Sequence, residues 1–143
     1  MIGIDTTFLV HLEVAGMPEH PRARQLFQSE VLDTGAQVAL APQVVSEFLH
    51  VVADQRRFSR PLTVDQALDR ARAWWTAREV RHVFPSDAST LSLLELLARH
   101  NLGPKRLLDT QLAATLLTAG VRRLLASSTW DFSIFPVLGL LAP

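Results

Sequence analysis

Four acidic residues stand at positions where a role in solubility would not place them. Asp5 ends an apolar N-terminal stretch, Glu47 lies within an apolar helical pattern, Asp109 begins a Leu- and Ala-rich run, and Asp131 follows another apolar stretch. Carboxylates that lie close together raise one another's pKa, and a divalent cation relieves their repulsion. Oxygen ligands alone suit Mg²⁺ or Mn²⁺, and a metal held by carboxylates can activate water against a phosphodiester. The acids therefore indicate metal-dependent phosphodiester hydrolysis.

The elements that must position these acids alternate along the chain. Apolar runs predict short strands at 1–5, 38–41, 80–84, 124–126 and 134–138. Helical periodicity and the Pro and Gly boundaries predict helices at 6–14, 21–32, 43–57, 61–78, 86–100 and 105–119, with Thr63 as an N-cap. Because the strands are apolar on both faces, we expect an α/β fold with a parallel sheet covered by helices on both sides.

In such a sheet the ends of the strands and the first turns of the following helices meet at one edge, where ligands bind. All four acids would converge there. Three of the four acids also have an ordinary structural interpretation: Asp5 as a helix N-cap, Asp109 as an acid favoured at a helix N-terminus and Asp131 as a turn residue. Glu47 is the hardest to explain in that way, because its helix has little polar surface. Other acids, such as Glu13, fit solvated helix faces.

Length and composition limit the function classes. A chain of 143 residues predicts one domain, 1–143, and the absence of cysteine excludes disulfides and thiolate chemistry. Fourteen basic and fourteen acidic residues give a net charge of zero, so nucleic-acid binding would need a local basic patch. No uncharged run approaches the roughly 20 residues of a membrane span, and no leader is visible. We expect a soluble, cytoplasmic protein without a membrane partner.

Several other residues have both a functional and a structural interpretation. Lys105 and Arg106 precede Asp109 and are candidates for phosphate binding, whereas the remaining arginine clusters fit solvated helix ends equally well. His50, one turn after Glu47, fits a surface histidine better than a site residue. The pair at 74–75, both Trp, fits core and interface packing better than base stacking. The apolar positions within 8–12 and 23–31 could belong to the core or to a dimer surface.

Four segments together resemble the PIN-domain family, and within it the VapC-type toxins of bacterial toxin–antitoxin pairs. They are 2–6 (IGIDT), 42–48 (PQVVSEF), 108–115 (LDTQLAAT) and 130–132 (WDF). The order and spacing of the four segments are more specific than any one of them, and the resemblance covers essentially the whole chain.

The resemblance implies a three-layer α/β/α sandwich around a parallel sheet of about five strands. It implies an endoribonuclease that depends on Mg²⁺ or Mn²⁺, with Asp5, Glu47, Asp109 and Asp131 as its catalytic acids. Asp5 and Asp109 would be the principal metal ligands, Asp131 would bind the metal directly or through water, and Glu47 would orient a water or hold a second ion. It also implies an RNA substrate, a homodimer and a small antitoxin that occupies the acidic groove.

The chain departs from the family pattern at three positions. Thr7 stands where the family usually has Asn, and Ala126 and Ser128 stand where it commonly has Thr and Asn. Thr7 and Ser128 can still hydrogen-bond, and with Lys105 and Arg106 they are the candidates for substrate binding. Loss of such support residues can cost roughly 10–100-fold in activity, which leaves a catalytically weak or inactive PIN-like binding or dimerisation module as the alternative.

A third class, phosphoryl transfer on a small molecule, is disfavoured. The residues after Asp5 form no D-x-D motif, and the stretch 124–129 contains no lysine. No glycine-rich loop follows a strand, which also disfavours nucleotide-binding folds of the P-loop and dinucleotide types.

Overall fold

A computed structural model describes residues 1–135 and 138–143. The strands are β1 (Ile2–Ile4), β2 (Val38–Leu40), β3 (Val80–His82), β4 (Arg123–Leu125) and β5 (Gly139–Leu141). The α-helices are α1 (Thr6–Glu13), α2 (His20–Phe27), α3 (Pro42–Val52), α4 (Val64–Thr76), α5 (Asp87–Arg99), α6 (Leu107–Thr118) and α7 (Thr129–Phe132). A π-helical segment, η1 (Gln28–Leu32), continues α2, and a 3-10 turn, η2 (Pro104–Arg106), precedes α6.

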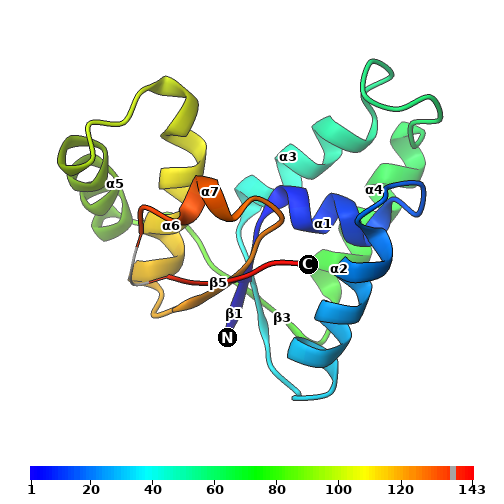
Figure 1. Ribbon diagram of the computed structural model, residues 1–143, viewed down its shortest axis with the longest axis horizontal. Helices are drawn as coiled ribbons and strands as arrows, with labels where there is room; N and C mark the ends of the chain where they lie inside the picture. The colour runs from blue at the N-terminus through cyan, green and yellow to red at the C-terminus, as the bar shows by residue number, and fades with distance from the viewer. Residues whose placement is uncertain (136–137) are drawn as a thin grey trace.

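The sheet confirms the α/β prediction. Its five strands are all parallel, in the order β3-β2-β1-β4-β5. Helices α1 to α4 cover one side and α5 to α7 the other, so the fold is a three-layer α/β/α sandwich (Figure 1). Within the described ranges, no helix is both long and apolar enough to cross a membrane.

The strands are buried on both faces, as their composition predicted. Ile4, Leu40 and Leu124 are fully buried, and helix residues such as Phe8 and Phe48 complete the same core. Burial of each such side chain contributes roughly 1.5–3 kcal/mol. Phe8 and its neighbours on α1 therefore belong to the core, not to a dimer surface.

Gly3 shows how closely the layers approach. A Cβ atom at this position would lie 2.7 Å from Cδ1 of Leu116 on α6 and 3.2 Å from Cδ1 of Leu124. Only glycine allows this contact between β1 and α6 without displacement of a buried side chain.

The boundaries differ from the sequence prediction in two helices. The helix expected at 43–57 ends at Val52, and Asp54 then accepts a hydrogen bond from the backbone N–H of Arg56 at 2.9 Å, a local turn that replaces further helix. Helix α4 begins at Val64, not at 61, because Thr63, the predicted N-cap, forms a reciprocal capping box with Gln66.

The C-terminal elements were predicted least well. The expected strand at 134–138 is wrong as placed: β5 is Gly139–Leu141, with Leu140 opposite Leu124, and 136–137 lie outside the described residues. Phe135 and Leu138 are apolar because they fill the core, at 2% and 4% exposure, not because they lie in a strand. The short helix α7 was not predicted at all.

Candidate active site

The acidic residues lie at the edge formed by the C-terminal ends of the strands. Strand connections run one way from β1 to β2 and β3, and the other way from β4 to β5, so the order reverses between β1 and β4. Asp5 follows β1 at this point, and its backbone N–H donates to the carbonyl of Leu125 in β4 at 3.0 Å. Ligand sites of open parallel sheets form at such a reversal.

Asp5 is both a helix cap and a member of the acidic cluster. Its Oδ1 accepts a hydrogen bond from the N–H of Phe8 at 2.6 Å, so it caps α1. Only 5% of the residue is exposed. Burial raises the pKa of Asp5 to about 7; the Phe8 and Ser127 amides oppose this rise, and the charges of Asp109 and Asp131 add to it. A cap alone needs no neighbouring carboxylates.

Asp109, in the first turn of α6, feels the same cluster. Burial raises its pKa to about 6, the charge of Asp131 adds to the rise, the guanidinium of Arg106 opposes it, and Glu47 adds a smaller contribution. Asp109 is therefore close enough to Asp5, Asp131 and Glu47 for its charge to interact with each of them. The convergence expected from the sequence is present in the structure.

Glu47 is held by two neighbours that the sequence analysis missed. Its Oε2 accepts from the hydroxyl of Thr6 at 3.2 Å, and its Oε1 accepts from the amide of Gln43 at 2.8 Å. The same Gln43 amide donates to the carbonyl of Leu108 at 2.7 Å, which ties α3 to α6. The spacing of four residues between Gln43 and Glu47 was the available signal for one of these contacts. For the contact of Thr6 with Glu47, the sequence offered no signal beyond the position of Thr6 directly after Asp5.

Asp131 forms an ion pair with Arg106. The guanidinium Nη1 lies 2.5 Å from Oδ1 of Asp131, and the two side chains are 21% and 40% exposed. Arg106, a candidate for phosphate binding, is therefore paired with one of the four carboxylates. The sequence placed Arg106 near the site but did not indicate this partner.

The donor chemistry of the cluster fits a hard divalent cation. Carboxylate oxygens suit Mg²⁺ or Mn²⁺, and acids that raise one another's pKa are those a cation would stabilise. Among the described residues, no three acidic or histidine side chains already stand in metal-binding geometry. One oxygen of Asp5 accepts from the Phe8 amide, and one oxygen of Asp131 accepts from Arg106.

Comparison with known proteins finds neither a matching family model nor a matching curated protein. Solved structures do match. VapC20 of Mycobacterium tuberculosis, described as a toxin that cleaves the sarcin-ricin loop, superposes with a TM-score of 0.74 at 21% identity over 94% of this chain and 95% of its own. VapBC2 of Rickettsia felis, bound to a promoter DNA fragment, gives 0.68 at 16% identity over 100% and 99%. A toxin–antitoxin complex from Klebsiella pneumoniae gives 0.66 at 17% identity over 100% and 98%. The chain has the VapC fold.

The three positions that depart from the VapC-type pattern differ in their surroundings. Ala126 is fully buried and brings no polar side chain to the cluster. Ser128 is half-buried at the N-cap position of α7, where its side chain makes no capping bond. Thr7 is exposed and lines a cavity beside α1. Thr6, not Thr7, contacts a carboxylate of the cluster.

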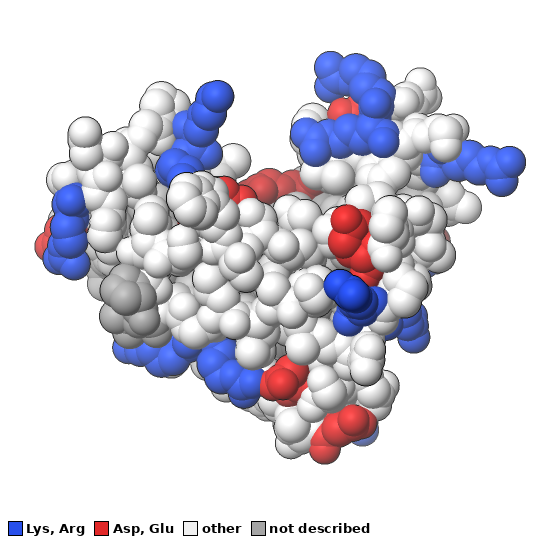
Figure 2. Space-filling model, in the orientation of Figure 1, with Lys and Arg blue, Asp and Glu red and all other residues white. Residues whose placement is uncertain are grey.

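In this VapC fold a hollow lies between two lobes. Figure 2 shows acidic side chains deep in the notch between the α5–α6 lobe and the α3–α4 lobe, with basic side chains on both rims. Arg56, Arg57 and Arg60 lie in the α3–α4 connection, and exposed Lys105 lies just before α6. His50 is exposed, as the sequence indicated. A chain of zero net charge thus presents local basic surface beside its acids.

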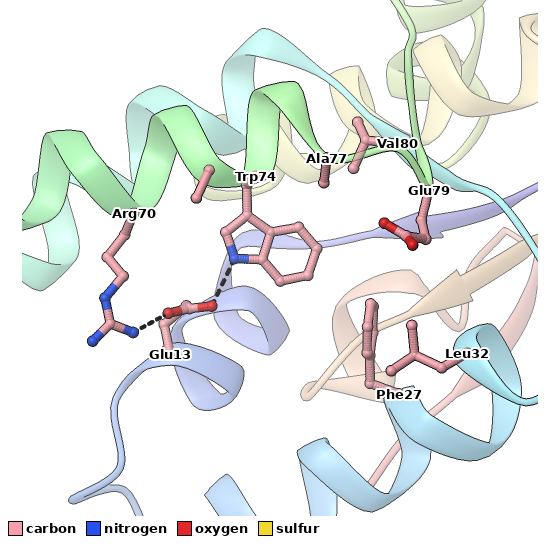
Figure 3. A pocket seen from close by; sticks show the side chains of 9 residues that line it. Glu13, Phe27, Leu32, Arg70, Trp74, Ala77, Glu79 and Val80 are labelled. Atoms are coloured by element: carbon pink, nitrogen blue, oxygen red, sulfur yellow. Dashed lines mark hydrogen bonds and ion pairs between the residues drawn. The ribbon is translucent and has the colours of Figure 1, made fainter.

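A second pocket, away from the acids, accounts for Trp74. Its indole N–H donates to Glu13 at 2.7 Å, the other Glu13 oxygen binds Arg70, and Phe27 packs edge-on at a centroid distance of 5.5 Å (Figure 3). Trp74 is therefore a packing residue, as predicted. The prediction of a solvated Glu13 is wrong, because its side chain is only 17% exposed and joins α1 to α4. Trp75 stacks on His82, with ring centroids 3.7 Å apart.

Proposed function

We propose that this chain is a metal-dependent endoribonuclease of the VapC type, the toxin of a toxin–antitoxin pair. The observation that carries the proposal is the convergence of four carboxylates, two of them with raised pKa, where the strand order reverses. Burial and mutual repulsion of these acids destabilise the folded chain, and such clusters of groups with shifted pKa are typical of functional sites. The VapC fold and the basic rims of the hollow add support.

The proposed roles follow from the contacts. Asp5 and Asp109 would be the principal ligands for Mg²⁺ or Mn²⁺, with Asp131 joining them when it leaves Arg106. The cation would supply activation of water and stabilisation of charge on the phosphate. Glu47, fixed between Thr6 and Gln43, would orient the attacking water and accept its proton.

Two neighbours of the site would handle the substrate's backbone. Arg106, once released from Asp131, and exposed Lys105, directly before it in the chain, would bind RNA phosphates. This position of the two cations would hold the scissile phosphate over the acids and leave the bases to be read elsewhere.

The proposal includes protein partners and a place in the cell. The Rickettsia felis and Klebsiella pneumoniae structures are a VapBC2 structure and a toxin–antitoxin complex, and by likeness of fold we infer a small antitoxin that covers the acidic hollow. We infer a homodimer as well, supported by Leu91 and Leu94 on α5, which are 64% and 58% exposed. A cytoplasmic location would place the enzyme with cellular RNA.

The decisive experiment is cleavage of a pool of structured RNAs with Mn²⁺ or Mg²⁺, beside EDTA. The wild-type chain should cleave only with metal, and the Asp5→Asn, Asp109→Asn variant should lose at least about 100-fold of the rate. Asparagine still caps a helix, so the variant should fold. A matched control, Asp65→Asn with Asp69→Asn on exposed positions of α4, should keep full activity. Cleavage that survives EDTA or the Asp5, Asp109 variant would sink the proposal.

One observation favours a second candidate, a non-catalytic binding module. Arg106 neutralises Asp131 without any metal, and buried Ala126 offers the cluster no hydrogen bond. Isothermal calorimetry separates the candidates. A folded chain that takes up neither Mg²⁺ nor Mn²⁺ at millimolar concentration and cleaves no RNA would be the module.

A further inference from the structure

A cavity opens beside the acidic hollow, between α1 and the α3–α4 connection. Its volume is about 330 Å³, within the roughly 300–1,000 Å³ of typical small-ligand sites. Residues from α1 (Thr6, Thr7 and His11), the loop after α1 (Met17) and the α3–α4 connection (Arg57 and Phe58) are among those that line it. The carboxylate cluster does not line the cavity, so the two sites are adjacent but distinct.

Thr6 connects the cavity to the cluster. It lines the cavity, and its hydroxyl donates to Glu47 at 3.2 Å. Asp5, the preceding residue, caps the same helix with its carboxylate. A chain-like substrate whose phosphate lay over the acids would therefore have its neighbouring nucleotide beside this opening.

The lining suits an uncharged planar group. Thr7 and His11 offer hydrogen bonds, and Met17 and half-buried Phe58 offer apolar contact. Burial lowers the pKa of His11, while Glu19 partly opposes this, and Ser127 bonds its Nδ1 at 2.8 Å. Arg57 is the charged residue of the lining. Its side chain is 56% exposed, and its Nε forms an ion pair with Oδ2 of Asp54 at 3.5 Å, so its charge lies toward solvent.

We propose that this cavity holds an unpaired base of the RNA, next to the phosphate that is cut, with Phe58 stacked on the base and Arg57 on the adjoining phosphate. The inference rests on the proposed nuclease function and adds its specificity site. Proteins that read single-stranded RNA splay bases out onto aromatic rings and bind their edges with polar groups. Thr7 and His11 contact the base edge here, and Thr6 couples the bound base to Glu47.

Binding without cleavage tests the cavity directly. The probes are fluorescein-labelled single-stranded RNA decamers of U, A or C and an abasic decamer of equal charge, measured by fluorescence anisotropy in EDTA. The wild-type chain should bind at least one of the base-bearing decamers about tenfold more tightly than the abasic one, as loss of one stacked base predicts. Phe58→Leu, which keeps apolar bulk but removes the ring, should lose most of this difference.

A matched control separates the ring from general effects. Phe84→Leu removes an aromatic ring that is 59% exposed and packs against Trp75 and His82 instead of the cavity. It should leave both affinities unchanged. Thr7→Val, a nearly isosteric change at an exposed position, should alter which decamer binds best without changing affinity for the abasic one.

Cleavage of the RNA pool distinguishes failure of this inference from failure of the nuclease proposal. With sequenced cleavage ends, Phe58→Leu should relax the base preference beside the cut and raise KM about tenfold, with a smaller effect on kcat. Unchanged preference and affinity in Phe58→Leu, with active wild-type enzyme, would overturn the base site alone. If the variant instead only weakened inhibition by an antitoxin, the cavity would hold a partner side chain and the inference would be wrong. Absence of metal-dependent cleavage by the wild-type chain would overturn the nuclease proposal and this inference with it.

Discussion

At the scale of single residues, the clearest feature is a buried carboxylate that carries both a structural and a chemical task. Asp5 caps α1 and is surrounded by other acids, so its charged form is stabilised by the Phe8 amide and opposed by burial and by its neighbours. Sequence reasoning offered these two interpretations as alternatives, and the structure combines them. A residue at a strand end that also begins a helix can do both.

The pKa of Asp5 predicts a pH dependence of stability in EDTA. Its folded-state pKa, about 7, lies above the ordinary value of 3.8, so the folded state binds the proton more tightly than the unfolded state. The contribution of Asp5 to the free energy of unfolding is therefore fully present below about pH 4 and is lost as the pH rises toward 7. The loss amounts to at most about 4 kcal/mol from the size of the shift.

Urea unfolding at pH 5 and pH 8 measures this loss. Asp5→Asn should flatten the pH dependence, and Asp65→Asn, at an exposed site, should leave it as in the wild type. Millimolar Mn²⁺ should restore stability at pH 8 to the wild-type chain more than to Asp5→Asn, because the cation binds the ionised acid. A stability that rises between pH 5 and 8, and does so through Asp5, would contradict the raised pKa.

Thr6 allows a second prediction at this scale. Its hydroxyl positions Glu47, so Thr6→Val should lower the rate of RNA cleavage by roughly tenfold, whereas Thr6→Ser should restore most of it. Equal rates for Thr6→Val and the wild type would show that the hydrogen bond from Gln43 alone suffices to hold Glu47.

At the scale of elements, local signals located most helices and four of the five strands. Apolar runs located β1 to β4, and capping residues such as Thr63 and Ser86 fixed helix starts. The apolar pattern at 134–138 gave a wrong strand prediction, because Phe135 and Leu138 are apolar residues buried in the core and do not lie in a strand. Period and hydrophobicity report burial, and burial alone does not separate a strand from a packed loop.

Packing between elements predicts the effect of one methyl group. Gly3→Ala would place its Cβ against the side chains of Leu116 and Leu124, both fully buried, so at least the Leu116 side chain must shift. We expect the unfolding free energy to fall by about 1–3 kcal/mol, measured by urea denaturation. Gly16→Ala is the matched control, because no atom lies within 4 Å of its added Cβ. Equal stability of the two variants would show that α6 yields easily above β1.

At the scale of the whole molecule, the candidate site was predictable in outline and not in detail. The topology of a parallel sheet brings strand ends to one edge, so Asp5, Glu47, Asp109 and Asp131 could be grouped from the sequence. Their partners could not be. The contact of Gln43 with Leu108 and that of Arg106 with Asp131 depend on how helices are set against one another across 65 and 25 residues of sequence.

The distribution of charge was likewise predictable in outline but not in detail. A net charge of zero excluded a globally basic surface but not a hollow with acids at its floor and basic side chains on both rims. Cations on both sides of an acidic floor suit a polyanion that must approach a metal-holding cluster without repulsion.

The last prediction concerns assembly. Helix α5 packs on α6 but leaves Leu91 and Leu94 exposed, while Glu95 and Arg99, of opposite charge and one turn apart, lie beside them. Two α5 helices packed antiparallel about a two-fold axis would bury the leucines and bring Glu95 of each copy toward Arg99 of the other. Sedimentation analysis should find a dimer, and Leu91→Glu with Leu94→Glu should shift it to a monomer with unchanged circular dichroism. Val64→Glu, at a 66% exposed position of α4, should leave the dimer intact. A double variant that stays dimeric would place the interface elsewhere on the molecule, because two buried glutamates facing their copies would cost the dimer several kcal/mol.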